Sequence, residues 1–217
     1  MSKKEDKSLG QILRDAIVSQ LYDVHVCLPA RIEKYVPERQ KADCKPLLTR
    51  RYSAEQRDTE LPVITDVPVQ WPAAGGGAAY LHLPLKKGDL GMLVFCERSL
   101  DAWLQGSGQI VSPADPRHHH LSDAIFIPGV RPFGAALAGV SADNAVLQNG
   151  QMRVELSPDG KISIEGASEE FLTIVDSVLD HLIAAQVVSG VGAAPFIAST
   201  IANFQGDKAR LATIKRV

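Results

Sequence analysis

The sequence has few of the residues that build metal sites, disulfide frameworks or nucleic-acid grooves. Its three cysteines, Cys27, Cys44 and Cys96, are odd in number and far apart, so they form neither a C-x-x-C metal pair nor a closed disulfide framework. Aromatic residues make up only 6%, and 23 basic against 25 acidic side chains leave a net charge of −2. The overall basic charge expected of a protein bound to nucleic acid through phosphate contacts is therefore missing.

Signals for export and for membrane insertion are also lacking. The N-terminus, MSKKEDKSLGQ, has no apolar core segment, so we expect no secretory signal. No Lys, Arg, Asp or Glu occurs from His181 to Gly206, but Gly, Pro and polar residues interrupt this stretch too often to predict a membrane-spanning helix. With 45% apolar and 22% charged residues, the chain is expected to be mostly folded.

Catalytic motifs are absent from the sequence. There is no G-x-S-x-G or H-E-x-x-H motif, and Gly75–Gly77 lacks the ending of a phosphate-binding loop. Asp101, Asp115 and Asp123 lie near histidines in the sequence, but nothing in their spacing fixes a catalytic geometry. We therefore expect no enzymatic activity.

The run His118-His119-His120 is the one obvious metal candidate. Neighbouring residues of an extended strand point to opposite faces, so only His118 and His120 can share an ion, together with Asp115 or Asp123. Threefold symmetry can also gather three copies of one histidine. Packing within a loop is the favoured interpretation, and we predict no metal and no cofactor.

Residues 1–140 indicate a helical arm followed by a small barrel. Apolar residues at 3–4 spacing predict a helix within an arm of residues 1–20, with Ser8 as its N-cap. From residue 21 the period changes to two, and turns rich in Gly and Pro separate short strands with no long helix between them. This pattern favours an antiparallel barrel over residues 21–140. Strands are expected at 24–28, 62–71, 78–84, 90–97, 101–105 and 124–127.

The sharpest local signal is a structural turn formed by Gly88, Asp89 and Gly91. Two glycines bracket an acidic residue at the entry to an apolar strand. We expect a positive φ at Gly88 and a close approach of another backbone at this turn.

The second part of the chain has strands and then helices. Strands at 145–148, 151–156 and 161–165 have one apolar face that so short a segment cannot bury alone, which predicts a shaft over 141–167 completed by other subunits. Residues 168–217 are expected to be helical, with Ser168 as a cap, a linker at 189–198 and a second helix from about residue 200. Ordinary packing of the two helices on each other remains an equal alternative to a coiled coil. The predicted trimer seam has 4-3-4 spacing and consists of Phe171, Val175, Val178 and Leu182.

Two segments resemble a known family. The runs KKGDLGMLVFCERSLDAW (residues 86–103) and HLSDAIFIPGV (residues 120–130) are similar to the N-terminal oligonucleotide/oligosaccharide-binding (OB) barrel of contractile-tail phage baseplate spike proteins. The similarity covers about residues 10–165. The resulting fold class is mainly β: an N-terminal OB-like barrel, a short intertwined trimeric β-helix or β-prism shaft, and a C-terminal helical segment.

The resemblance implies a function in the virion. It implies a homotrimer at the tail baseplate, made in the host cytoplasm, which acts as a central spike or hub, contacts the host envelope transiently and binds tail tube or baseplate hub proteins but no nucleic acid. Family members with their own piercing tip carry an iron-binding His-x-His motif at the apex of a longer shaft. Here the only His-x-His, His118 to His120, lies in the barrel loop, so no iron site is transferred and a separate spike-tip protein is a further candidate partner.

Two other functions remain as alternatives. An OB-fold protein that binds nucleic acid or glycan needs a basic groove with aromatic platforms, and it ranks second because aromatic residues are few and the net charge is negative. A peptidoglycan hydrolase ranks third because no catalytic pair is recognisable. The candidate residues of the binding surface are Arg50, Arg51, Tyr52, Trp71 and Tyr80.

Overall fold

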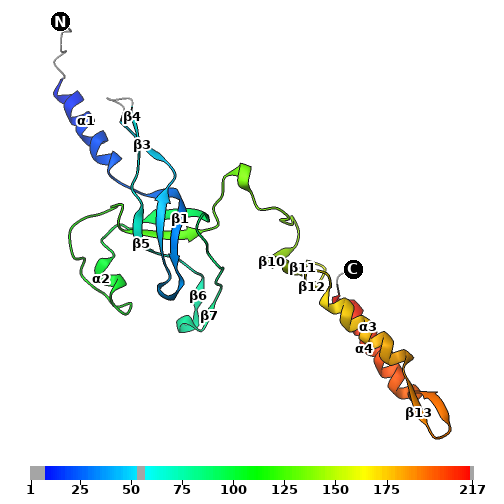
Figure 1. Ribbon diagram of the computed structural model, residues 1–217. Coiled ribbons are helices and arrows are strands. Elements are labelled where there is room, and N and C mark those ends of the chain that lie inside the picture. The colour runs from blue at the N-terminus through cyan, green and yellow to red at the C-terminus, as the bar shows by residue number, and fades with distance from the viewer. Residues whose placement is uncertain (1–7, 53–56, 216–217) are drawn as a thin grey trace. The chain divides into compact units, whose positions relative to one another are not determined.

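A computed structural model of the chain describes residues 8–52 and 57–215 (Figure 1). The chain divides into two compact units, Met1–Ala136 and Leu137–Val217, which are described separately below. Residues 1–7 of the predicted arm and residues 216–217 of the predicted helical region lie outside the described residues.

The first unit begins with helix α1, Leu9–Tyr22. Ser8 caps it as predicted: its Oγ accepts from the backbone N of Gln11 at 3.3 Å, and Oε1 of Gln11 accepts from the backbone N of Ser8 at 2.8 Å. This reciprocal capping box satisfies two amide groups that a helix start would otherwise leave unpaired. No residue of α1 is buried, so the described residues leave the apolar side chains of this helix uncovered.

The body of this unit is one curled five-stranded sheet in the form of a half-barrel (Figure 1). Its order is β5-β2-β1-β8-β9, and every neighbouring pair is antiparallel. The curl brings the two outer strands together, because Val69, just after β5, forms a parallel bridge with Phe126 of β9. The strands are β1 Cys27–Val36, β2 Lys41–Pro46, β5 Ile64–Pro68, β8 Leu90–Phe95 and β9 Ala124–Pro128.

The core lies inside the curl of this sheet. Buried and half-buried residues alternate along β2 and β8, as the period-two pattern of the sequence requires. Phe126, Ile32 and Leu93 are completely buried, and each contributes about 1.5–3 kcal/mol of hydrophobic stabilisation. The other buried core residues are Ala30, Ala42, Cys44, Ile64, Val67, Val69, Phe95 and Ala124.

Short elements connect the main strands. The prediction of a strand at 101–105 is wrong, because Asp101–Leu104 is a helical turn, α2. The buried carboxylate of Asp123 accepts from the backbone N of Leu100 at 2.9 Å and holds the chain at the start of this turn. Of the strand expected at 78–84, only β7 forms. The remaining elements are β3 Thr49–Tyr52, β4 Arg57–Glu60, β6 Ala73–Ala74, β7 Ala79–Tyr80, and the 3₁₀ turns η1 Pro37–Arg39, η2 Gly75–Gly77 and η3 Phe133–Ala135.

The turn before β8 contains two glycines with different roles. Gly88 has a φ of 97°, a left-handed conformation that favours glycine, and the side chain of Asp89 accepts from the backbone N of Lys86 at 2.7 Å. Gly91 lies inside β8 opposite Pro128 of β9. A Cβ at position 91 would lie 2.5 Å from Cζ of Phe126 and would also collide with the carbonyl oxygen of Ile127, so this position has no room for a side chain.

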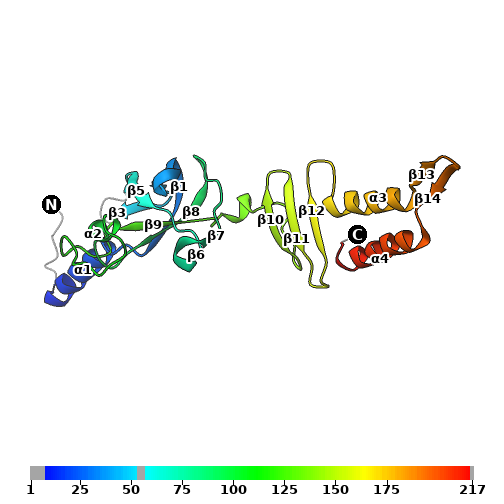
Figure 2. The ribbon, with the colours of Figure 1, turned by 90° about the horizontal axis from the view of Figure 1, so that it is seen from below.

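The second unit is a three-stranded antiparallel meander followed by a helical hairpin (Figure 2). Helices α3 and α4 pack side by side, and the end of α4 returns to the sheet, where Lys215 bridges Ile162 in parallel. The elements are β10 Ala145–Asn149, β11 Met152–Leu156, β12 Ile162–Glu165, α3 Phe171–Ala184, β13 Gln186–Ser189, β14 Gly192–Pro195 and α4 Ala198–Ile214.

Two local predictions for this unit are wrong. Glu170, rather than Ser168, caps α3, because its carboxylate accepts from the backbone N of Leu172 at 3.0 Å and of Thr173 at 2.6 Å. The same carboxylate accepts from the backbone N of Ile164 at 3.2 Å, so the cap also binds the helix to the sheet. The stretch 189–198 is not a plain linker, because β13 and β14 pair there as a hairpin.

Candidate functional site

The three-stranded sheet of the second unit has an apolar face that the described part of the chain leaves open. Its register places Leu147, Val154 and Ile164 side by side, and likewise Leu156 and Ile162. Cross-strand neighbours share one face of a sheet. On this face Leu147 is 54% exposed and Leu156 is 52% exposed. An exposed apolar surface of this kind marks an interaction site.

The opposite face of this sheet is polar and better covered. Glu155 is buried; it accepts from Nδ2 of Asn144 at 2.6 Å and from Nε of Arg153 at 3.1 Å. Nη1 of Arg153 also donates to the side chain of Gln148 at 3.2 Å. The chain thus covers the polar side of the sheet itself and leaves the apolar side available.

The structure splits the predicted trimer seam between two sides of α3. Val175 and Leu182 are half-buried, whereas Phe171 and Val178 are about half exposed. The buried side carries the contacts with α4. The sequence analysis missed Ile174, which is 46% exposed and lies three residues from Phe171 and four from Val178.

Ion pairs hold α4 against α3. Nζ of Lys215 lies 3.2 Å from a carboxylate oxygen of Asp176, and Lys208 pairs with both Asp176 and Asp180. The hydrogen bonds that Lys215 and Lys208 donate lower the pKa of Asp176 below its ordinary value, and those that Lys208 donates to Asp180 and Asp176 raise its own pKa. The carboxylates of α3 are therefore engaged by α4.

In the first unit, the three aspartates noted in the sequence converge on Arg117. This guanidinium donates to Asp115 and Asp101 at 2.6 Å each, and to Asp123 at 2.7 and 2.9 Å. Burial acts to raise the pKa of Asp123, but the bonds from Arg117 and the Leu100 amide outweigh it and lower that pKa below the ordinary value. An ionised carboxylate neutralised in this way is a structural anchor and a poor proton acceptor. Arg117 was not among the residues predicted from the sequence, where Asp115, two residues earlier, is its local partner.

His118 and His120 make hydrogen-bond contacts within their own loop, whereas His119 contacts the segment before β1. Nδ1 of His118 lies 3.2 Å from the carbonyl oxygen of Pro116, and Nδ1 of His120 lies 2.8 Å from Oγ of Ser122. His119 has a φ of 48° and reaches the carbonyl oxygen of His25. Within residues 8–52 and 57–215, no three His, Cys, Asp or Glu side chains are grouped so that they could bind a metal ion.

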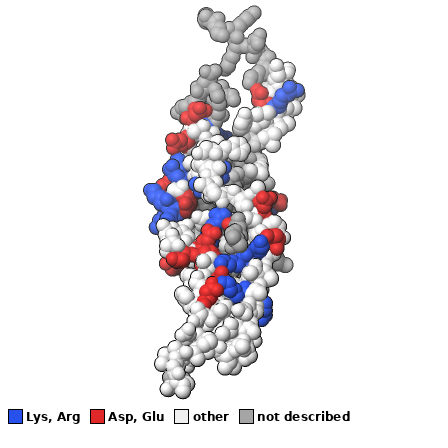
Figure 3. Space-filling view, turned by 90° about the vertical axis from the view of Figure 1, so that its right-hand side faces the viewer, with Lys and Arg blue, Asp and Glu red and all other residues white. Residues whose placement is uncertain are grey.

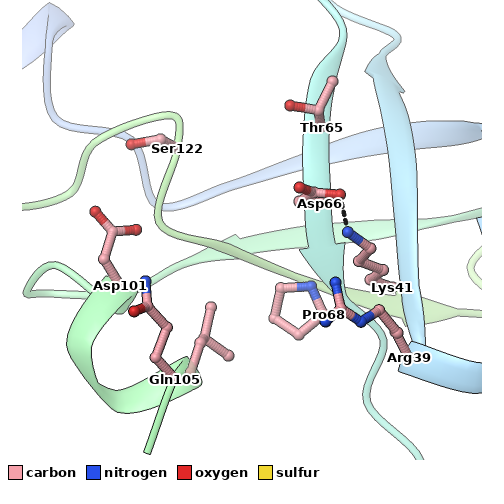
Figure 4. Close-up of a pocket in the computed structure, with 9 residues that line it drawn as sticks. Arg39, Lys41, Thr65, Asp66, Pro68, Asp101, Gln105 and Ser122 are labelled. Atoms are coloured by element: carbon pink, nitrogen blue, oxygen red, sulfur yellow. Dashed lines mark ion pairs between the residues drawn. The ribbon is translucent and has the colours of Figure 1, made fainter.

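A polar hollow of about 730 Å³ lies beside β5 and α2 (Figure 4). Lys41 and Asp66 form an ion pair on one side of it at 2.5 Å, and Arg39 lies on the same side. Asp101 points into the hollow from the other side but is engaged by Arg117. Its remaining lining residues are Thr65, Pro68, Leu104, Gln105 and Ser122, which include no aromatic platform for a sugar or a base.

Of the residues of the alternative binding surface whose side chains the structure describes, Arg50 and Trp71 are engaged by the chain itself. Arg50 donates to Asp23 at 2.6 Å, and Trp71 packs against the core with its ring 4.9 Å from that of His82. Tyr80 is 70% exposed. The side chains of Arg51 and Tyr52 lie outside the described residues.

The end of the helical hairpin carries no charge. Figure 3 shows white surface where β13 and β14 lie, in agreement with the absence of Lys, Arg, Asp and Glu from residues 181–206. None of the described helices combines the length and the apolar character needed to cross a bilayer.

Comparison with known families bears on the half-barrel. The family model described as "Phage protein Gp138 N-terminal domain" matches residues 28–129. This half-barrel is similar to a phage-protein domain. The matched range runs from the second residue of β1 to the residue after β9 and therefore includes strand residues from all five strands of the sheet. The expected relation to phage proteins is confirmed. No curated protein matches the chain.

Proposed function

We propose that this chain is a non-catalytic structural component of a phage, or phage-like contractile, tail baseplate, in which three copies form a central spike or hub that assists penetration of the host envelope. The match of residues 28–129 to the phage Gp138 N-terminal domain carries the proposal. The match supports association with the virion, and the location at the baseplate is proposed in addition to it.

The connectivity of the half-barrel supports an OB-type domain. In chain order, the first long strand, β1, pairs with the second, β2, and the fourth, β8, while the third, β5, leads into a parallel bridge with the fifth, β9. A five-stranded, partly open Greek-key barrel is the architecture of OB domains. The Val69–Phe126 bridge is the point at which such a barrel closes.

The open apolar face of the β10–β12 sheet supports assembly with further copies. A three-stranded sheet is stable in water only when its apolar face is covered, and the described part of the chain leaves Leu147, Met152 and Leu156 more than half exposed. Intertwining of three such sheets into a shaft covers all of these faces at once. Tail tube or hub proteins, and a separate tip protein, are the partners of the assembled spike.

Charge supports a mechanical role. Residues 141–189 carry two basic and eight acidic side chains, so this segment is repelled by DNA and by anionic envelope surfaces. Electrostatic attraction therefore does not drive the spike towards the envelope, and contraction of the tail supplies the force.

The purified full-length chain tests the assembly, and virions test the location. Light scattering is expected to give three times the chain mass of 23.4 kDa. Immunogold labelling of virions that contain the protein is expected at the baseplate. A monomer at micromolar concentration contradicts the spike, and labelling of the capsid contradicts the baseplate location.

A further inference from the structure

The two helices of the C-terminal hairpin differ in what they present outward. On α3, Phe171, Ile174 and Val178 are exposed to 54%, 46% and 50% of their area. Their spacing of three and then four residues places them on one helix face. We refer to these three residues as the α3 stripe.

The other side of α3 is covered by α4 and takes up the charge. Leu172 is 8% exposed, and Asp176 and Asp180 pair with Lys208. The α3 stripe therefore carries no charge, and it ends at His181, the next residue on the same face. A helix whose apolar surface extends beyond the part covered by its own chain requires a second covering partner.

The outward face of α4 is polar. Ile214 is the only large hydrophobic side chain of this helix that is substantially exposed, at 47%. This polar face is stable in contact with solvent, whereas exposure of the apolar α3 stripe to solvent is unfavourable. The exposed polar residues of α4 are Ser199, Asn203, Gln205, Asp207, Arg210 and Thr213.

The α3 stripe follows closely on the open face of the sheet. Gly166 lies between β12 and α3, and Sδ of Met152, on the apolar sheet face, is 3.8 Å from the position of a Cβ at Gly166. The Glu170 cap binds the first turn of α3 to β12. The open sheet face and the α3 stripe are therefore joined by the short connection 166–170 within one unit.

We propose that the helical hairpins of three copies form a six-helix bundle in which the α3 stripes meet at the centre and α4 faces water. This inference rests on the proposed trimer and adds its C-terminal half. Identical helices with apolar residues at 3–4 spacing complement one another, so two further copies of the same stripe fit it. The bundle extends the interface beyond the short sheets and places the charge-free β13–β14 ends together.

Cysteine cross-linking of the full chain tests this arrangement. In a Cys27→Ser, Cys96→Ser background, Val178→Cys places a thiol on the stripe, and Arg210→Cys places a matched thiol on the outward face of α4. The remaining Cys44 is buried, and burial raises the pKa of its thiol to about 12, so it does not interfere. We expect mild oxidation to give disulfide-linked pairs of chains for Val178→Cys. The yield of linked pairs is expected to be at least five-fold higher than for Arg210→Cys.

A second variant, Ile174→Asp, measures the contribution of the stripe to assembly. Ile174 is exposed within one chain, so the fold of the hairpin is expected to persist in circular dichroism, while the concentration for half-dissociation rises at least ten-fold. If the wild type is a trimer, but Val178→Cys is not linked and Ile174→Asp half-dissociates at the wild-type concentration, the bundle is overturned and the proposed spike remains. A wild-type monomer overturns the spike assembly itself. Equal linking of both cysteine variants overturns the placement of α4 outside.

Discussion

Arg117 holds the buried carboxylate of Asp123 with two nitrogen atoms: Nε donates to Oδ2 at 2.7 Å and Nη2 to Oδ1 at 2.9 Å. The same guanidinium binds Asp101 at the start of α2 and Asp115 in the following loop. Because Asp123 is completely buried, its charge is tolerated only with these partners. One arginine thereby fixes the long connection between β8 and β9.

Removal of this arginine is expected to destabilise the first unit. Arg117→Ala leaves the buried Asp123 without its counter-ion, at a cost of about 3 kcal/mol in the free energy of unfolding. Urea denaturation measures the effect. Arg98→Ala is the matched control: its pair with Glu97 is exposed, so the change is within about 0.5 kcal/mol. Equal effects of the two substitutions contradict an anchoring role for Arg117.

The Asp123 cluster also predicts acid sensitivity. The pKa of Asp123 is lowered in the folded state, so its contribution to stability is fully present above the unfolded value of about 3.9 and is lost as pH falls through the folded pKa. The urea midpoint of the wild type is therefore expected to fall from pH 5 towards pH 2. Asp123→Asn lowers stability at pH 7 but flattens this acid dependence. Parallel pH profiles for the two proteins would exclude Asp123 as a source of the effect.

Gly91 is expected to be intolerant of any side chain. A Cβ there collides with the Ile127 carbonyl and the Phe126 ring, and overpacking of this kind costs about 1–3 kcal/mol. Gly91→Ala is compared by thermal unfolding with Gly134→Ala, where no atom lies within 4 Å of the added carbon and the change stays within about 0.5 kcal/mol. Gly88→Val is expected to cost about 1–3 kcal/mol, through backbone strain instead. Wild-type stability of Gly91→Ala would contradict the close approach of β8 and β9.

The sequence predicts those elements whose signals are local. The Ser8 capping box is complete within four residues. In β8 and β11, apolar and other residues alternate in the sequence because each strand has one face that is more buried than the other. The helical turn α2 has no comparable local signal, because the Asp123 carboxylate that holds its start is more than twenty residues away. A long-range contact therefore stabilises a helical turn where the local sequence pattern predicts a strand.

The candidate site was predictable only in outline. The 4-3-4 spacing in α3 indicates that the helix has apolar contacts, but a helix with two apolar sides does not reveal which side faces its own chain. The ion pairs of Asp176 and Asp180 with Lys208 settle that question, since they place α4 on one side only. Phe171 and Val178 are left on the open side with Ile174.

The open face of the β10–β12 sheet predicts a specific loss of assembly. Leu147→Asp puts a charge on the apolar face, where it is desolvated in a trimer and solvated in a single chain. Light scattering is expected to show at least ten-fold weaker association. Gln148→Asp, one residue further along the same strand and on the polar face, is the matched control and leaves association unchanged. Association that resists Leu147→Asp would place the interface elsewhere.

Tight binding of single-stranded DNA is not expected. Such grooves combine free basic side chains with stacked aromatic rings, but Arg50 is paired with Asp23 and Trp71 packs between the core and His82. The net charge of −2 adds no general attraction for phosphates. Fluorescence anisotropy with labelled oligonucleotides at about 0.15 M salt measures binding where weak, nonspecific attraction is already reduced. Sub-micromolar affinity at this salt concentration would favour the nucleic-acid alternative. Charge on the described surface cannot produce such an affinity, so it would require a dedicated base-stacking site.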